Sequence, residues 1–168
     1  MEEITLDQIP RKTRDLYEKA MSALERGNAG YALDMLKQVI DVEPRFSLGR
    51  KNLRIAQVKA LLATKPNAMT HQMASLKGTF TLMGAQSKLK KDPKAALEGA
   101  EKLLALDPLN LPFLKFFAQA AEAAEMPELA VQTLEIARPY YAKDVEFLRL
   151  LARLYIATNQ PGGAKDCY

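Results

Sequence analysis

The C-terminal part of the chain repeats every 34 residues. Three segments begin at residues 77, 111 and 145. Small residues stand at the eighth and twentieth positions of these segments: Gly84 and Ala96, Ala118 and Ala130, Ala152 and Ala164. Bulky residues stand at the fourth position: Phe80, Leu114 and Leu148. Small residues at a fixed place on two neighbouring helices let their axes approach closely, so the period predicts stacked helix pairs.

Helices account for every long segment of the sequence. Ala and Leu dominate, and no stretch alternates apolar and polar residues as a strand does. Prolines lie between the apolar-periodic segments, where they begin or end helices. The predicted helices cover residues 11–26, 30–42, 47–64, 68–91, 94–106, 111–125, 127–140, 145–159 and 161–168. We therefore expect an all-α fold in which short loops hold neighbouring helices antiparallel.

The same frame fits the N-terminal segment when it begins at Thr13. The fixed positions are then Ala20 at 8, Gly27 and Asn28 at 15 and 16, Ala32 at 20 and Pro44 at 32. This pattern resembles the tetratricopeptide repeat (TPR), a family with Gly or Ala at position 8, Ala at 20 and Pro at 32. The resemblance covers residues 13–44 and 77–168. It implies antiparallel helix pairs stacked as a right-handed solenoid.

The repeat is interrupted in the middle of the chain. Pro44 and Pro108 are 64 residues apart, which is 30 more than one repeat. The excess accommodates an irregular extra helix near 47–64 and a longer helix at 68–91. Because first and second helices alternate, helix 47–64 has no regular partner. Either the superhelix breaks there, or 47–64 doubles back with 68–91 as an inserted hairpin.

We expect a single TPR-like domain over residues 1–168. Its repeats would be 13–44, 77–110, 111–144 and an incomplete 145–168, with an insertion at 45–76. The last repeat stops at Tyr168 inside its second helix, so we expect a fragment of a longer protein. An incomplete end favours end-to-end contacts, and self-association through it is a further expectation. The N-terminus lacks the apolar region of a secretory signal, and a cytoplasmic location is expected.

No catalytic centre, cofactor or metal site is predicted. His71 is the only histidine and Cys167 the only cysteine, and a lone histidine is most often a surface or hydrogen-bonded structural residue. No Gly-rich segment has the pattern of a phosphate loop, and metal-ligand spacing is absent. The sequence therefore favours a non-enzymatic scaffold for protein–protein interaction.

The TPR resemblance implies a concave groove, lined by first helices, that holds a peptide or partner helix. Carried over by position, the candidate groove residues are Tyr17, Met21, Thr81, Lys88, Lys115, Phe116, Gln119, Arg149 and Arg153. Glu122 and Glu146 occupy further groove positions. Cationic groups around Phe116 suit an acidic, partly apolar peptide. The alternative is that these residues are ordinary solvated charges.

Basic residues are concentrated in the middle of the chain. Residues 44–91 carry ten basic and no acidic residues, whereas the segments on either side each have a net charge of −3. The candidate basic patch consists of Arg45, Arg50, Lys51, Arg54, Lys59 and Lys65. An alternative function is therefore polyanion binding, to nucleic acid or an anionic membrane surface, through residues 45–91. An acidic protein partner and a merely solvated face are the other interpretations.

Two apolar patterns accompany the basic residues. Leu48, Ile55 and Leu62 recur every seven residues and predict the buried face of helix 47–64. Met69, Met73 and Met83 also lie at helical spacing. Core packing is the favoured interpretation of this methionine cluster. The alternative is an adaptable apolar surface for a partner helix.

Overall fold

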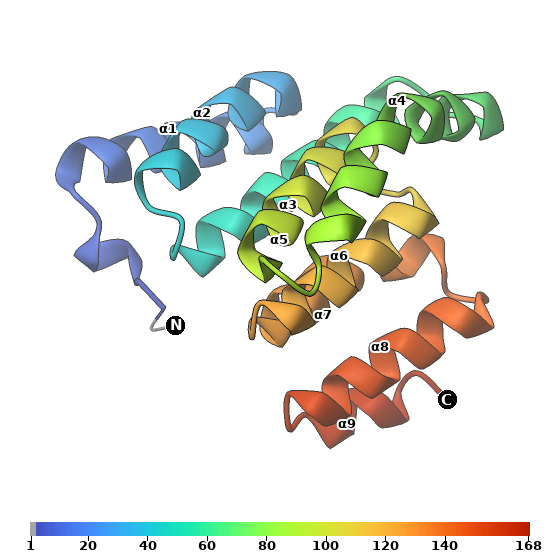
Figure 1. Cartoon of the computed structure of the whole chain (residues 1–168). Helices are drawn as coiled ribbons and strands as arrows, with labels where there is room; N and C mark the ends of the chain where they lie inside the picture. The colour runs from blue at the N-terminus through green and yellow to red at the C-terminus, as the bar shows by residue number, and fades with distance from the viewer. Residues whose placement is uncertain (1–2) are drawn as a thin grey trace. The chain divides into compact units, whose positions relative to one another are not determined.

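The computed structural model describes residues 3–168, and in this range it contains helices and no strand. The helices are η1 (Leu6–Gln8), α1 (Arg11–Glu25), α2 (Ala29–Val42), α3 (Ser47–Ala63), α4 (Ala68–Lys88), α5 (Pro93–Leu106), α6 (Leu111–Ala123), α7 (Pro127–Ala137), η2 (Arg138–Tyr140), α8 (Val145–Ala157) and α9 (Pro161–Lys165) (Figure 1). The predicted all-α fold of antiparallel helix pairs is confirmed, including the extra helix near 47–64. Only η1 was not expected, and α9 is shorter than predicted.

The helices begin where short polar side chains can cap them. Side chains of Asn28, Asn67, Asp92, Asn110 and Asp144 each accept a hydrogen bond from the backbone N–H three residues later. These bonds satisfy donors that have no partner inside the helix. Pro93, Pro127 and Pro161 occupy first positions of helices, where a missing N–H costs nothing. The boundaries therefore follow from local chemistry.

Three of the turns between paired helices are closed in the same way. At the fifteenth position, Gly27, Glu125 and Asn159 have φ values of 80°, 61° and 59°. The next N–H in each turn bonds to the carbonyl five residues back, at Ala23, Ala121 and Tyr155. This is the Schellman arrangement of a helix end. The turn after α4 differs, because the N–H of Asp92 bonds to Lys88, only four residues back.

The chain divides into two compact units, Met1–Lys65 and Pro66–Tyr168. In the N-terminal unit, α2 packs against α1 and α3, and α3 also contacts α1. Its core includes Tyr17, Leu36, Val39 and Phe46. A Cβ atom at Gly49 would lie 2.4 Å from the Phe46 ring, so glycine permits this close approach. Helix α3 begins 34 residues after Thr13 and takes the place of a first helix beside α1.

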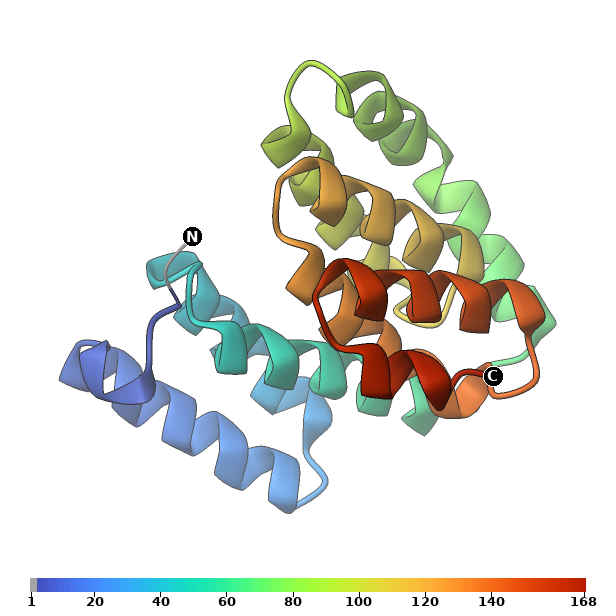
Figure 2. The same ribbon diagram turned by 90° about the horizontal axis from the view of Figure 1, so that it is seen from below.

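The C-terminal unit consists of three successive helix pairs. Helices α4 and α5, α6 and α7, and α8 and α9 pack as chain neighbours, and α5 and α7 link one pair to the next (Figure 2). Large side chains fill the space between them: Leu103, Phe113, Leu114, Phe117, Leu134, Phe147 and Leu151. The first helices α4, α6 and α8 thus carry the surface on which groove residues were predicted.

Two predicted buried faces are wrong. Leu48 and Leu62 of α3 are exposed, and the buried residues of this helix include Gly49 and Ala56. The methionine cluster of α4 is also exposed, so core packing is not its role. In α4 every buried residue is small, and small residues allow close approach of a neighbouring helix. Helix α3 buries larger side chains as well, including Arg54.

Candidate functional site

Two ion pairs join α6 to α8 on the surface of the C-terminal unit. The ammonium group of Lys115 pairs with Glu146. The guanidinium of Arg153 donates two hydrogen bonds to Glu122, at 2.6 and 2.9 Å. Each pair joins residues 31 positions apart, so α6 and α8 run parallel and in register. The hydrogen bond with Glu122 raises the pKa of Arg153 above its ordinary value, which keeps this pair charged.

Arg149 and Gln119 lie on the same two helices, between these ion pairs. Arg149 is three residues after Glu146 and four before Arg153, and Gln119 is four residues after Lys115 and three before Glu122. Residues at these spacings share one face of a helix. Both side chains are exposed, and among residues 3–168 no ion pair is found for Arg149. The middle of this face therefore offers a cation and an amide that are free to bind a ligand.

Lys88 of α4 has a corresponding position one repeat earlier. It precedes Gln119 by the same 31 residues that separate the two ion-paired positions, and its side chain is exposed. We call Lys88, Gln119 and Arg149 the polar row. Its members come from three successive first helices, α4, α6 and α8.

Two of the predicted groove residues are corrected by their burial. The ring of Phe116 is 3% exposed, so it is a packing residue and not the aromatic centre of a peptide site. Tyr17 is buried in the N-terminal unit, where its hydroxyl accepts a hydrogen bond of 2.8 Å from Asn52 and its ring meets Phe46 edge-on. Burial raises the pKa of Tyr17. Met21 and Thr81 are half-buried.

The basic patch does not form one exposed face. Arg45, Lys51, Lys59 and Lys65 are exposed, and Arg50 donates a hydrogen bond of 2.6 Å to the carbonyl of Pro44. Arg54 is 4% exposed and donates a hydrogen bond of 2.5 Å to Gln57. Its prediction as an exposed member of the basic patch is therefore wrong. Arg54 stands at the eighth position counted from Ser47, where the repeat has a small residue. The 34-residue step from Thr13 to Ser47 was the signal that could have revealed this register.

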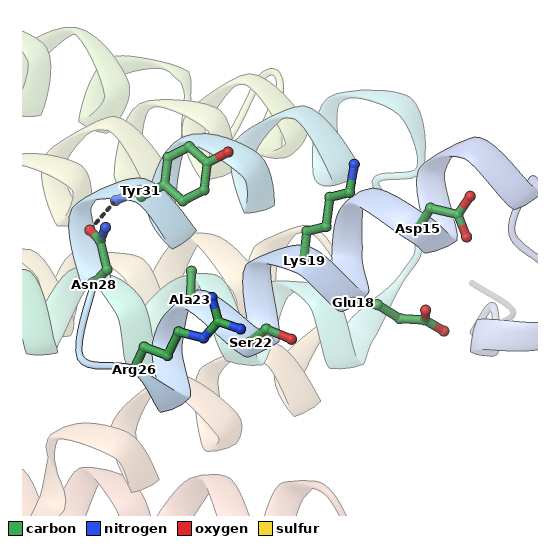
Figure 3. A pocket seen from close by; sticks show the side chains of 8 residues that line it. All are labelled: Asp15, Glu18, Lys19, Ser22, Ala23, Arg26, Asn28 and Tyr31. Atoms are coloured by element: carbon green, nitrogen blue, oxygen red, sulfur yellow. Dashed lines mark hydrogen bonds between the residues drawn. The ribbon is translucent and has the colours of Figure 1, made fainter.

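One hollow beside α1 is lined by side chains that do not converge on a common point (Figure 3). It is lined by Asp15, Glu18, Lys19, Ser22, Ala23, Arg26, Asn28 and Tyr31. Figure 3 shows the charged side chains spread along α1, while the Asn28 side chain is engaged with the Tyr31 backbone. An assortment of exposed, scattered charges does not define a ligand site.

The residues with potential catalytic chemistry have structural contacts. His71 Nδ1 lies 2.5 Å from a carboxylate oxygen of the fully buried Asp107. Burial raises the pKa of the Cys167 thiol, which favours its unreactive protonated form. Across residues 3–168, no group of three His, Cys, Asp or Glu residues could hold a metal ion. No helix in the same range is long and apolar enough to cross a membrane.

Comparison with known proteins finds a structural likeness only. No protein-family model matches the sequence, and no curated protein matches it. A solved structure of MamA 41-end from Desulfovibrio magneticus RS-1 is 18% identical, with a TM-score of 0.43, and the match covers 94% of this chain and 92% of that chain. A solved structure of MamA AMB-1 is also 18% identical, with a TM-score of 0.44, and the match covers 93% of this chain and 90% of that chain. Likeness at this level carries no argument about function.

Proposed function

We propose that this chain is a TPR-type scaffold that binds an acidic peptide across its first helices, without catalysing a reaction. The observation that carries this proposal is the polar row, in which Arg149, which has no ion pair within residues 3–168, lies between two ion pairs that join α6 to α8. The ion pairs hold the face in shape before a ligand arrives. A preformed face loses less entropy on binding than a mobile one.

The chemistry of the row favours carboxylates. The guanidinium of Arg149 can grip a carboxylate with two hydrogen bonds, and Lys88 offers a second positive charge. Gln119, between them, can both donate to and accept from a peptide backbone. Lys115 and Arg153 already have carboxylate partners. The ligand's acidic groups are therefore matched to Lys88 and Arg149.

The spacing of the helices gives the spacing of those acidic groups. Packed helix axes lie about 10 Å apart, so Lys88 on α4 and Arg149 on α8 are separated by about 20 Å. An extended peptide rises about 3.3 Å per residue, and about six residues cover this distance. The ligand we propose is an extended segment with two carboxylates about six residues apart.

The test uses a fluorescein-labelled peptide of Gly and Ser with two Glu residues at that separation, and measures fluorescence anisotropy with the whole chain. Arg149→Glu should weaken binding at least about tenfold, since a charged hydrogen bond contributes about 1.5–3 kcal/mol. Lys143→Glu makes the same change of charge at an exposed position outside the row and should leave the affinity within about twofold. Equal effects of the two variants would refute the proposal.

Polyanion binding through residues 45–91 is separated by a second titration, with labelled double-stranded DNA in low salt. Contacts to phosphate weaken steeply as salt is added. If the double variant Lys51→Glu, Lys59→Glu lost DNA binding and Arg149→Glu kept it, the basic patch would be the functional surface instead. The proposed peptide site predicts that Arg149→Glu weakens binding of the acidic peptide and that the double variant does not.

A further inference from the structure

Helix α4 exposes its largest apolar side chains. Five of them form one stripe, which we call the apolar ridge: Met69, Met73, Leu76, Phe80 and Met83. Their exposed fractions are 68, 48, 68, 87 and 62%. The spacing alternates between four and three residues, which is the heptad spacing of a seam that packs against another helix. An exposed apolar stripe of this size marks an interaction site.

The ridge lies opposite the face by which α4 is held in its own unit. Successive helical residues are separated by about 100°, which places the five ridge residues within an arc of about 80°. Ala74, Gly78 and Ala85 are buried and lie on the other side of the helix. A Cβ atom at Gly78 would be 2.6 Å from the Phe113 ring, and one at Gly99 would be 2.5 Å from the Cβ of Ala85. Helix α4 thus has two packing faces, of which one is occupied.

The same repeat positions are buried in the next first helix. Phe80 and Met83 occupy the fourth and seventh positions of their repeat. The corresponding residues of α6, Leu114 and Phe117, are 0% and 1% exposed. Helix α6 packs against the preceding helix, α5, whereas no helix of the C-terminal unit precedes α4 in the chain. Positions that are buried in α6 are therefore exposed in α4.

We propose that the apolar ridge is the docking site of an amphipathic helix from a partner protein, with acidic residues beside its apolar stripe. The ridge extends from Met69 to Met83, 14 residues further along the helix, or about 21 Å at 1.5 Å per residue. A partner helix of about four turns would cover it. Three methionines give the ridge side chains that adapt to a partner's shape, since the thioether is flexible and polarisable.

The flanks of the ridge indicate the charge of the partner. Helix α4 contains no carboxylate, and Lys77 and Lys88 lie beside the ridge. A hollow between α4 and α5 reaches Phe80 and is lined by Lys88 and Lys102, with one acid, Glu98. This excess of positive charge complements acidic residues at the flanking heptad positions of a partner.

A second copy of the chain fits the ridge less well. Two α4 helices would bring basic flanks together without an acidic residue in either helix. Lys88 belongs to the polar row and also flanks the ridge, whereas none of the five ridge residues is part of the polar row.

The probes are two labelled helical peptides about three heptads long, with Leu at the apolar positions. One carries Glu at the flanking positions and the other Lys. Fluorescence anisotropy with the whole chain should show at least about tenfold tighter binding of the Glu peptide.

Leu76→Ser with Phe80→Ser should weaken binding of the Glu peptide at least about tenfold. The matched control, Val145→Ser with Ile156→Ser, removes two other exposed apolar side chains and should have less than a twofold effect. Lys77→Glu should reduce the preference for Glu over Lys.

Several results would overturn this inference. One is equal affinity for the two peptides, and another is unchanged binding by the Leu76→Ser, Phe80→Ser variant. A lower melting temperature of that variant without peptide would show that the ridge is already packed in the free chain. A dimer in sedimentation velocity that becomes a monomer in the same variant would identify a second copy as the occupant. Arg149→Glu should not alter binding of the helical peptides, so failure of the polar row and failure of the ridge are separable.

Discussion

Helix α4 buries small residues and exposes large apolar ones, whereas α6 and α8 bury large apolar residues together with alanines. The buried residues of α4 are Ala74, Gly78 and Ala85. In α6 and α8 the buried residues include phenylalanines and leucines: Phe113, Leu114, Phe117, Phe147, Leu151 and Leu154. The difference teaches that apolar size does not by itself mark a core. A helix packed by its small residues can keep a full set of large ones for another partner.

The largest expected effect comes from truncating equivalent residues on the two kinds of helix. Leu114→Ala removes a fully buried side chain and should destabilise the C-terminal unit by about 2–5 kcal/mol. Phe80→Ala, at the same repeat position in α4, should change stability by no more than about 0.5 kcal/mol. Urea unfolding of the whole chain, followed by far-UV circular dichroism, measures both. Similar losses in the two variants would mean that α4 does not differ from α6 as described.

Two glycines on α4 should respond in opposite directions to the same substitution. A Cβ at Gly78 would lie 2.6 Å from Phe113 and 2.8 Å from Leu103, so Gly78→Ala should cost about 1–3 kcal/mol through overpacking. Nothing lies within 4 Å of a Cβ at Gly84, so Gly84→Ala should stabilise the helix by about 0.5–1 kcal/mol. The urea midpoints of the two variants should move apart. If Gly78→Ala did not lower the urea midpoint, the face of α4 that contains Gly78 would be loosely packed.

The helices were predictable because their ends are determined locally. Asx caps and first-position prolines mark the starts, and the predicted starts agree with the structure to within one residue. The packed faces were less predictable. Leu48 and Leu62 have the periodicity of a buried stripe, but α3 approaches its neighbours through Gly49. Periodicity reports that an apolar stripe exists, and it does not report whether a neighbouring helix is there to cover it.

The candidate site was predictable in part. Lys88, Gln119 and Arg149 follow from the repeat register and are exposed. The ion pairs of Lys115 and Arg153 were missed, although Glu146 and Glu122 had been placed on the same surface. Their pairing depends on the 31-residue offset between parallel first helices. That offset is a product of packing and is not visible in the 34-residue period.

The C-terminal unit also contains a partly buried tyrosine hydroxyl. Tyr141 stacks on Phe147 and donates a hydrogen bond to the carbonyl of Leu109. Burial, followed by the charges of Asp107 and Asp144, raises the pKa of Tyr141 above 10.0. The proton-bound form is thus favoured by folding. Its contribution to stability is present below pH 10 and is lost as the pH rises through the folded-state pKa.

Tyr141→Phe should therefore cost about 1 kcal/mol near neutral pH, from the lost hydrogen bond, and less in alkali. The urea midpoints of the two proteins, compared at neutral pH and above pH 10, measure this change. Other titrating groups are common to both proteins and cancel in the difference. If the difference between the two urea midpoints became larger above pH 10, the assigned direction of the pKa shift of Tyr141 would be contradicted.

The ion pairs between α6 and α8 should contribute less than the buried contacts. In a double-mutant cycle with Glu122→Gln and Arg153→Gln, we expect a coupling of about 0.2–1 kcal/mol, as for other exposed pairs. Arg153 is more than half exposed, so added salt should reduce the coupling. Urea unfolding at low and high salt provides the measurement. A coupling that is insensitive to salt would indicate that the pair is more buried than the structure shows.

The smallest expected effect is a new ion pair between α4 and α6. Lys88 precedes Gln119 by the offset of the two existing pairs, so Gln119→Glu should create a third pair and add about 0.2–1 kcal/mol at low salt. The gain should vanish when Lys88→Gln is added, and Gln72→Glu is a matched control, because it makes the same change of charge at an exposed position of α4 about four turns from Lys88. The new carboxylate would also compete with an acidic peptide for Lys88, so stability and peptide affinity should change in opposite directions. A gain that persists without Lys88 would show that the 31-residue register does not extend from α6 to α4, and the polar row would then be limited to Gln119 and Arg149.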